Sequence, residues 1–245
     1  MLHSINTLPT HLIVGVKKAA TTWIWKQVEN RKEVSTAVDK EIWYFTKNYH
    51  LGINWYKKQF KPNKVIIDNT PDYFHASIAK KIYNILPNAK IMVCLRNPVE
   101  RALSHFKHAR FIDSIKKDIN FMDAWRQDMR DIRKYGLYNK CLEEYIKFFG
   151  KRFEIYLYDD LTSDSFQFIK NFYKFLGIEF KLSSNFEGKW IPCVDNDNEK
   201  LNLYNQINKD IFITRDEKKI LFDYYRESIH QTEKIIGRDL SSWLK

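Results

Sequence analysis

The chain has 245 residues, of which 44% are hydrophobic, and it contains only 7 glycines and 6 prolines. This composition excludes a collagen-like, linker-like or disordered protein and allows a sizeable core. Lys plus Arg exceed Asp plus Glu by 41 to 30, a formal net charge of +11, so we expect the protein to attract anions. We find no secretory leader, no membrane-spanning window and no Cys/His spacing typical of zinc, and therefore expect a cytoplasmic protein without a metal.

Short apolar runs predict buried parallel strands, because they do not alternate with polar residues. These runs are His11–Val16, Lys64–Asp68, Lys90–Leu95 and Phe153–Tyr158. Helical spacing of apolar residues predicts helices at Ala76–Leu86, Pro98–Phe111, about 137–149, about 166–176 and 215–228. The alternation predicts an α/β fold with a central, mostly parallel sheet flanked by helices.

No linker or internal repeat marks a boundary, so we expect a single domain over residues 1–245. It would consist of a motif-bearing core at about 11–177 and a helical C-terminal part at about 178–245. The last core helix is expected to follow the cap candidates Thr162 and Ser163 and to end at Gly177.

The first predicted strand runs directly into a basic segment that a predicted helix follows. The segment reads Lys17-Lys18-Ala19-Ala20-Thr21-Thr22-Trp23. A strand, a tight basic loop and a helix start predict an anion cradle, since N–H groups at a helix N-terminus have no intrahelical partner. The Walker sequence GxxxxGK[ST] is absent, which disfavours a nucleoside triphosphatase. Taken alone, such a segment is more often a solvated helix start.

A second basic segment stands where the Lys90–Leu95 strand ends and a helix begins. It reads Arg96-Asn97-Pro98-Val99-Glu100-Arg101-Ala102-Leu103-Ser104. Arg101 and Ser104 are three residues apart and share a helix face, so together with Arg96 they could grip a second phosphate. The alternative is that Arg101 pairs with a neighbouring carboxylate and Ser104 is an ordinary surface residue.

The two segments, in this order, resemble the sulfotransferases that use 3′-phosphoadenosine 5′-phosphosulfate (PAPS). The motif pattern is most similar to the heparan-sulfate and other carbohydrate members. Three further stretches carry the resemblance, which covers about residues 11–177: 39–45 (DKEIWYF), 68–74 (DNTPDYF) and 158–161 (YDDL). The resemblance implies a P-loop-like 5′-phosphosulfate-binding loop after the first strand, PAPS as co-substrate and no metal requirement.

The resemblance also implies roles for individual residues. Lys18 matches the family's catalytic lysine, and Glu41 matches its general base toward the acceptor, although Glu41 could also be an ordinary exposed residue in a charged triplet. Arg96 and Ser104 match the 3′-phosphate ligands. The residues implied to hold the 5′-phosphosulfate are Lys17, Lys18, Ala19, Ala20, Thr21, Thr22 and Trp23, and those implied to contact the acceptor are Lys40, Asn69 and Tyr73.

The chain departs from the family pattern at three places. Ala19 and Ala20 stand where the family usually has glycine, so either the backbone there has negative φ or the donor sits slightly differently. Asn69 stands where heparan members often carry Lys, which argues against a strongly anionic acceptor. Gly188-Lys189-Trp190 and a lone Cys193 stand in place of a Lys-Gly-Arg loop beside a disulfide.

The sequence therefore predicts a sulfotransferase that moves a sulfuryl group from PAPS to a hydroxyl or amine of an acceptor, with carbohydrate preferred. The alternatives, in order, are a small-molecule, lipid or peptide acceptor, a P-loop-type kinase, and a basic nucleic-acid-binding protein. We expect no nucleic-acid and no membrane partner, and the sequence leaves the oligomeric state open.

Overall fold

The structure is a computed structural model that describes residues 7–181 and 198–245. The described residues fall into two compact units. The sheet unit takes its residues from Met1–Leu95 and Glu143–Ile191, and the helical unit takes its residues from Arg96–Leu142 and Pro192–Lys245. Each unit thus combines two separate stretches of the chain. Within the described residues, no helix is both long and apolar enough to cross a membrane.

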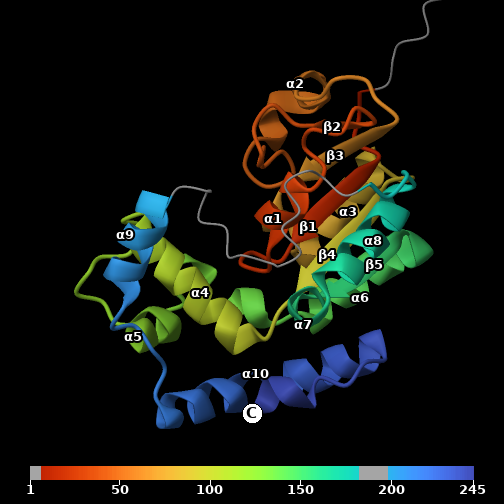
Figure 1. The fold of residues 1–245 in the computed structure, drawn as a ribbon. Helices are drawn as coiled ribbons and strands as arrows, with labels where there is room; N and C mark the ends of the chain where they lie inside the picture. Colours follow the sequence, from red (N-terminus) through yellow and green to blue (C-terminus); the bar gives the residue numbers. More distant parts are fainter. Residues whose placement is uncertain (1–6, 182–197) are drawn as a thin grey trace, which may run out of the picture. The chain divides into compact units, whose positions relative to one another are not determined.

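The sheet unit is built on five parallel strands in the order β2-β3-β1-β4-β5 (Figure 1). The strands are β1 (His11–Gly15), β2 (Val34–Thr36), β3 (Val65–Asn69), β4 (Lys90–Leu95) and β5 (Phe153–Leu157). Central β1 is buried along its whole length, as a strand covered on both faces must be. The predicted α/β class and parallel sheet are confirmed, and among the strands of residues 7–181 and 198–245, β2 alone was not predicted from the sequence.

Helices cover both faces of this sheet. The helices of this unit are α1 (Thr21–Lys26), α2 (Gly52–Lys58), α3 (Ala76–Ile85), α6 (Asn139–Phe149, which belongs to it from Glu143 onward), α7 (Tyr158–Ser163) and α8 (Ser165–Leu176). On one face, Phe168 of α8 lies 5.3 Å from the ring of Tyr156 in β5. Phe153, three residues earlier in β5, points to the opposite face and lies 5.2 Å from Tyr145 of α6.

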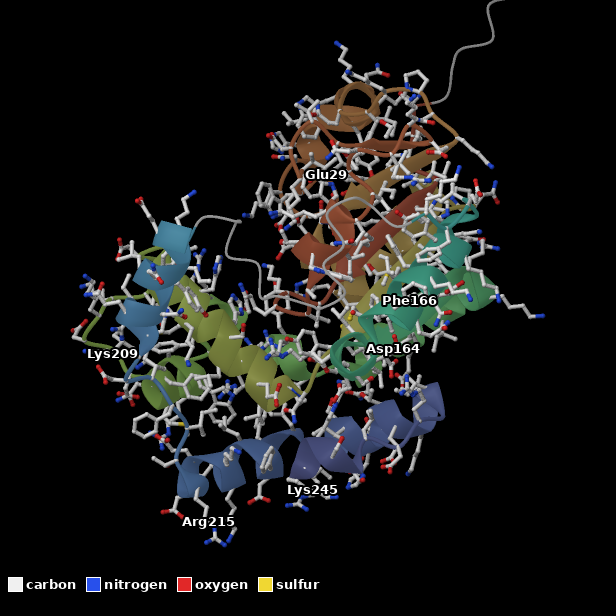
Figure 2. All side chains as sticks on the ribbon, viewed as in Figure 1. Glu29, Asp164, Phe166, Lys209, Arg215 and Lys245 are labelled. Atoms are coloured by element: carbon white, nitrogen blue, oxygen red, sulfur yellow. The ribbon has the colours of Figure 1, made fainter. Side chains whose placement is uncertain are left out.

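The start of α8 differs from the sequence prediction. Thr162 and Ser163 are not its caps, because they belong to the short helix α7. Asp164 is the N-cap, and its carboxylate accepts a hydrogen bond from the backbone N–H of Gln167 at 2.9 Å. Figure 2 shows Asp164 and Phe166 at this end of α8. The predicted end is confirmed, since Gly177 adopts the left-handed conformation with φ of 68°.

The helical unit contains α4 (Pro98–Phe111), α5 (Phe121–Arg126), α9 (Asn198–Asn208) and α10 (Arg215–Ile236). Helix α10 starts at the predicted residue with a capping box between Thr214 and Glu217, and it extends eight residues beyond the predicted end. Tyr225 anchors α10 in the unit, because its hydroxyl donates to the Arg133 carbonyl at 2.9 Å and accepts from the Trp125 indole at 3.1 Å.

Candidate active site

The basic segment after β1 forms a tight loop, Val16–Ala20, here called the β1–α1 loop. Its start is tied to β4, since the Val16 N–H donates to the Cys94 carbonyl at 2.9 Å. The side chains of Lys17 and Lys18 are partly exposed, whereas Ala19 is fully buried. The loop therefore places two lysines at the carboxyl end of the central strand, the edge at which open parallel sheets bind ligands.

Ala19 and Ala20, which stand where the family usually has glycine, differ in their backbone conformation. Ala19 is not among the residues with positive φ, so a side chain is tolerated there. Ala20 has φ of 61° and Lys18 has φ of 71°, both in the left-handed region that favours glycine. The loop thus adopts a glycine-like path at Ala20 without a glycine.

The segment Asn69–Phe74, which begins at the last residue of β3, lies against this loop. A Cβ added to Gly15 would come within 2.8 Å of Cβ of Phe74 and 3.2 Å of the Pro71 carbonyl oxygen, so only glycine fits there. The ammonium of Lys17 forms an ion pair with the carboxylate of Asp72. Asn69 donates from its side-chain amide to the Thr21 carbonyl at 3.4 Å.

The candidate base Glu41 is held on a loop that is hydrogen-bonded to β3. Its carboxylate lies 2.8 Å from the ammonium of Lys40, and both side chains are 25% exposed. The next residue, Ile42, donates its N–H to the Thr70 hydroxyl at 3.3 Å, and Thr70 donates to the Asp68 carboxylate at 2.6 Å. The Glu41 side chain is therefore partly exposed and paired. The residue after it, Ile42, is held in place by the hydrogen bonds that run through Thr70 to Asp68.

Asp68 is the centre of this anchor and was not singled out as a functional residue from the sequence. It is fully buried and also accepts hydrogen bonds from the hydroxyls of Tyr56 at 2.7 Å and Tyr73 at 3.1 Å. Burial raises the pKa of Asp68 to about 6; the hydrogen bonds from Thr70 and the two tyrosines oppose this rise, and the charge of Glu41 adds to it. A signal was present, because Asp68 is a lone carboxylate in an otherwise apolar run.

Two residues implied to contact the acceptor lie in the interior of the sheet unit. Tyr73 is 0% exposed and engaged with Asp68, and Asn69 is 1% exposed beside Thr21. Tyr73 is hydrogen-bonded to Asp68, and Asn69 is hydrogen-bonded to the first residue of α1, so both stabilise the site from within. Their roles as acceptor contacts stay predictions, as does that of the partly exposed Lys40.

The second basic segment opens α4 in the helical unit. Asn97 caps the helix by accepting the N–H of Val99 at 2.9 Å, and Pro98 takes the first helical position, as predicted. The guanidinium of Arg96 lies 3.4 Å from Glu100 and is partly exposed, and its carbonyl accepts the Tyr138 hydroxyl at 2.6 Å. Ser104 is partly exposed on α4.

Arg101 was expected either to bind a phosphate or to pair with a neighbouring carboxylate, and the structure shows a third arrangement. It is 0% exposed and donates to the backbone carbonyl of Ile132, with Nδ1 of His105 3.4 Å from its second terminal nitrogen. This side chain therefore holds the helical unit together. The late segment Gly188-Lys189-Trp190 and Cys193 lie outside the described residues.

The five-stranded parallel sheet, with its basic loop after the first strand, defines an α/β protein of the P-loop-like class. The chain belongs to the sulfotransferase domain family, whose sequence model matches residues 8–230. The predicted family resemblance is confirmed by this match.

Individual relatives and solved structures agree with the family. The human bifunctional heparan sulfate N-deacetylase/N-sulfotransferase 3 is 25% identical over 275 residues, covering 98% of this chain and 31% of that protein. A sulfotransferase structure from Alicyclobacillus acidocaldarius superposes with a TM-score of 0.76 at 20% identity, covering 97% of this chain and 99% of that one. Mouse sulfotransferase SULT7A1 complexed with PAP gives a TM-score of 0.61 at 12% identity, covering 96% and 90%.

This chain spans 22% to 31% of the length of several curated relatives that it matches. The cytoplasmic location expected from the sequence stays a prediction.

Proposed function

We propose that this chain transfers a sulfuryl group from PAPS to a hydroxyl or amine of an acceptor, and that the acceptor is a carbohydrate. Membership of the sulfotransferase domain family and the heparan sulfate N-sulfotransferase relative support the reaction and the acceptor class. The mouse sulfotransferase complexed with PAP supports the nucleotide. The observation that carries the proposal is Lys18, partly exposed in the loop at the carboxyl end of the central strand.

In this reaction the acceptor oxygen or nitrogen forms a bond to sulfur while the bond from sulfur to the bridging oxygen of PAPS breaks. The acceptor loses a proton, and 3′,5′-adenosine bisphosphate (PAP) leaves with an additional negative charge on its 5′-phosphate. Sulfuryl transfer thus resembles phosphoryl transfer in needing alignment and charge stabilisation rather than covalent participation of the protein.

Each of these needs has a candidate residue in the chain. Lys18 would stabilise the leaving phosphate oxygen, and Glu41 would accept the proton of the acceptor. The Glu41 carboxylate is held by the Lys40 ammonium at 2.8 Å and is 25% exposed, so an acceptor can reach it. Arg96 and Ser104 would bind the 3′-phosphate and so select PAPS over nucleotides that lack it.

The acceptor is proposed to be a neutral or weakly charged carbohydrate. Asn69 occupies the position at which heparan members often have Lys, and it is 1% exposed and turned to the Thr21 carbonyl. A cation for a uronate or sulfate group is therefore absent from that position. Lys40 forms an ion pair with Glu41, and an anionic sugar would have to compete with the Glu41 carboxylate for its ammonium group.

Isothermal titration calorimetry with PAP and, separately, with ATP and magnesium tests the donor half of the proposal. We expect PAP to bind without metal and ATP with magnesium to bind more weakly; preferential binding of magnesium-ATP would favour a kinase and refute the donor assignment. Sulfuryl transfer to neutral sugars, uronate-containing oligosaccharides, phenols, lipids and peptides tests the acceptor half. Transfer confined to the non-carbohydrate acceptors would refute the acceptor class while the donor assignment stands.

A further inference from the structure

The β1–α1 loop follows a path that its own residues do not favour. Lys18 has φ of 71° and Ala20 has φ of 61°, although left-handed backbone is disfavoured for residues that carry a Cβ. Such a path persists only when the surrounding structure holds it. Strand β4 holds the start of this loop through the Val16 N–H, and the segment Asn69–Phe74 contacts its flanks and Lys17.

Asn69–Phe74 contacts the loop before, within and after the two lysines. Before them, Phe74 and Pro71 close over Gly15 so tightly that a Cβ at Gly15 would meet Phe74 at 2.8 Å. After them, the Asn69 amide donates to the Thr21 carbonyl at 3.4 Å. Between these two contacts, Lys17 forms an ion pair with Asp72.

Asp72 is itself held firmly. It lies in a short 3-10 turn, Pro71–Tyr73, that leads directly out of β3. The Tyr73 N–H donates to the Thr70 carbonyl at 3.1 Å, and the Tyr73 carbonyl accepts the Tyr145 hydroxyl at 2.7 Å. The Asp72 side chain is only 11% exposed and that of Lys17 is 28% exposed, so this pair is less screened than an ordinary surface pair.

We infer that Asp72 is a positioning residue for the sulfuryl-transfer reaction and acts through Lys17 on Lys18. By holding the Lys17 ammonium against the fixed turn after β3, Asp72 keeps the following residue, Lys18, in its left-handed conformation and its side chain in register with the donor. The two lysines are then not equivalent: Lys17 anchors the loop and Lys18 contacts the donor. The role assigned to Lys18 rests on the proposed function, whereas the anchoring of the loop does not.

The test compares Asp72→Asn, Lys17→Met and the double variant with the wild type. Asp72→Glu, which keeps the charge, serves as the conservative variant. Asp223→Asn is the matched control, because it also removes one carboxylate from an ion pair, the exposed pair of Asp223 and Arg226 at 2.5 Å. The melting temperature of each variant establishes that it folds before activity is compared.

Amide hydrogen exchange of the peptide that covers residues 15–22 tests the anchor without any substrate. We expect Asp72→Asn and Lys17→Met each to speed exchange there by about tenfold, with the double variant no faster than either, because all three remove one shared interaction. Exchange that is unchanged in Asp72→Asn, or effects that multiply in the double variant, would overturn the anchor.

Kinetics with PAPS test the consequence for the reaction. We expect kcat to fall by about 10- to 100-fold in each single variant, with KM for PAPS changed by about twofold at most, no further fall in the double variant and substantial recovery in Asp72→Glu. Wild-type kcat in Asp72→Asn, or a loss of PAP affinity in Lys17→Met that Asp72→Asn does not share, would overturn the positioning role. A wild-type protein that neither binds PAP nor transfers sulfuryl groups would refute the proposed function instead, and the exchange result would still decide the anchor.

Discussion

Replacing Asp68 by Asn should change how the stability of the protein depends on pH. Asparagine keeps the shape of the side chain but does not titrate. Its amide oxygen replaces only one of the two carboxylate oxygens that accept from Thr70, Tyr56 and Tyr73, and its NH2 group donates where the other oxygen accepted. Burial raises the pKa of the Asp68 carboxyl from 3.8 to about 6 in the folded protein. At one pKa unit for about 1.4 kcal/mol, this difference corresponds to about 3 kcal/mol.

The sign follows from proton binding. Between pH 4 and 6 the folded protein holds a proton on Asp68 that the unfolded chain has released, so the free energy of unfolding decreases as the pH rises through this window. Above about pH 6 both states are ionised and the contribution is constant. Relative to the wild type, Asp68→Asn should therefore gain about 2 kcal/mol between pH 4 and pH 7, because part of the full difference already lies below pH 4.

His11 opposes this dependence in the wild type. Burial, together with the charge of Lys90, lowers the pKa of His11 to about 4, so between about pH 4 and 6.5 the unfolded chain binds the extra proton. Its contribution to the free energy of unfolding rises with pH by about 3 kcal/mol over nearly the same window. The two contributions of the wild type should largely cancel, and Asp68→Asn should expose the rise that His11 causes.

Urea unfolding followed by tryptophan fluorescence at half-unit intervals from pH 4 to pH 7 measures this difference directly. The informative quantity is the change with pH of the variant minus the wild type, because any constant packing cost of the substitution drops out. A difference that stays constant within about 0.5 kcal/mol across the range would refute the assignment of a buried, late-titrating carboxyl to Asp68.

Three further predictions concern the proposed reaction. Lys18→Ala should leave the melting temperature unchanged and lower the rate constant of sulfuryl transfer, measured in single-turnover experiments, by about 10²- to 10³-fold, and a loss of only a few-fold would remove Lys18 from its role. Arg96→Ala and Ser104→Ala should raise the Kd for PAP but not that for 5′-AMP in calorimetry, and equal losses for both nucleotides would indicate a folding defect instead. Glu41→Gln should lower kcat by about 10²- to 10⁴-fold on sugar hydroxyls and much less on phenols; undiminished activity on sugars would exclude it as the base.

Much of the sheet unit could be predicted because its signals are local. Runs such as His11–Val16 and Lys90–Leu95 are apolar and rich in β-branched residues, and they became β1 and β4. Strand β2 was not predicted, because its three residues, Val34–Thr36, are too few to form a pattern. Their extended conformation depends on pairing with β3. The helix predicted at 215–228 ends eight residues before α10 does, although Gly237, whose left-handed conformation ends α10, is a stop signal in the sequence.

The support beneath the candidate site could not be predicted, because it is made of contacts between distant positions. Tyr56 and Asp68 meet across 12 residues and Ile42 and Thr70 across 28, separations that leave no periodic trace in the sequence. The sequence could not decide the backbone conformation of Ala20 for a similar reason. Its left-handed conformation depends on the neighbours that hold the loop rather than on the preference of alanine. Arg101 was misread because an arginine in a basic motif gives no sign of being buried.

The way the chain alternates between its two compact units limits how the gene can be divided. A fragment ending at Gly177 would keep every motif of the family pattern, yet it would remove α9 and α10. Residues 96–142 would then lose the Tyr225 hydroxyl that binds the Arg133 carbonyl and the Ser228 hydroxyl that lies 3.0 Å from the Asn139 side chain. We therefore expect the shortest stretch that contains the motifs not to fold by itself, and any truncated form used for crystallisation or screening should keep residues through α10.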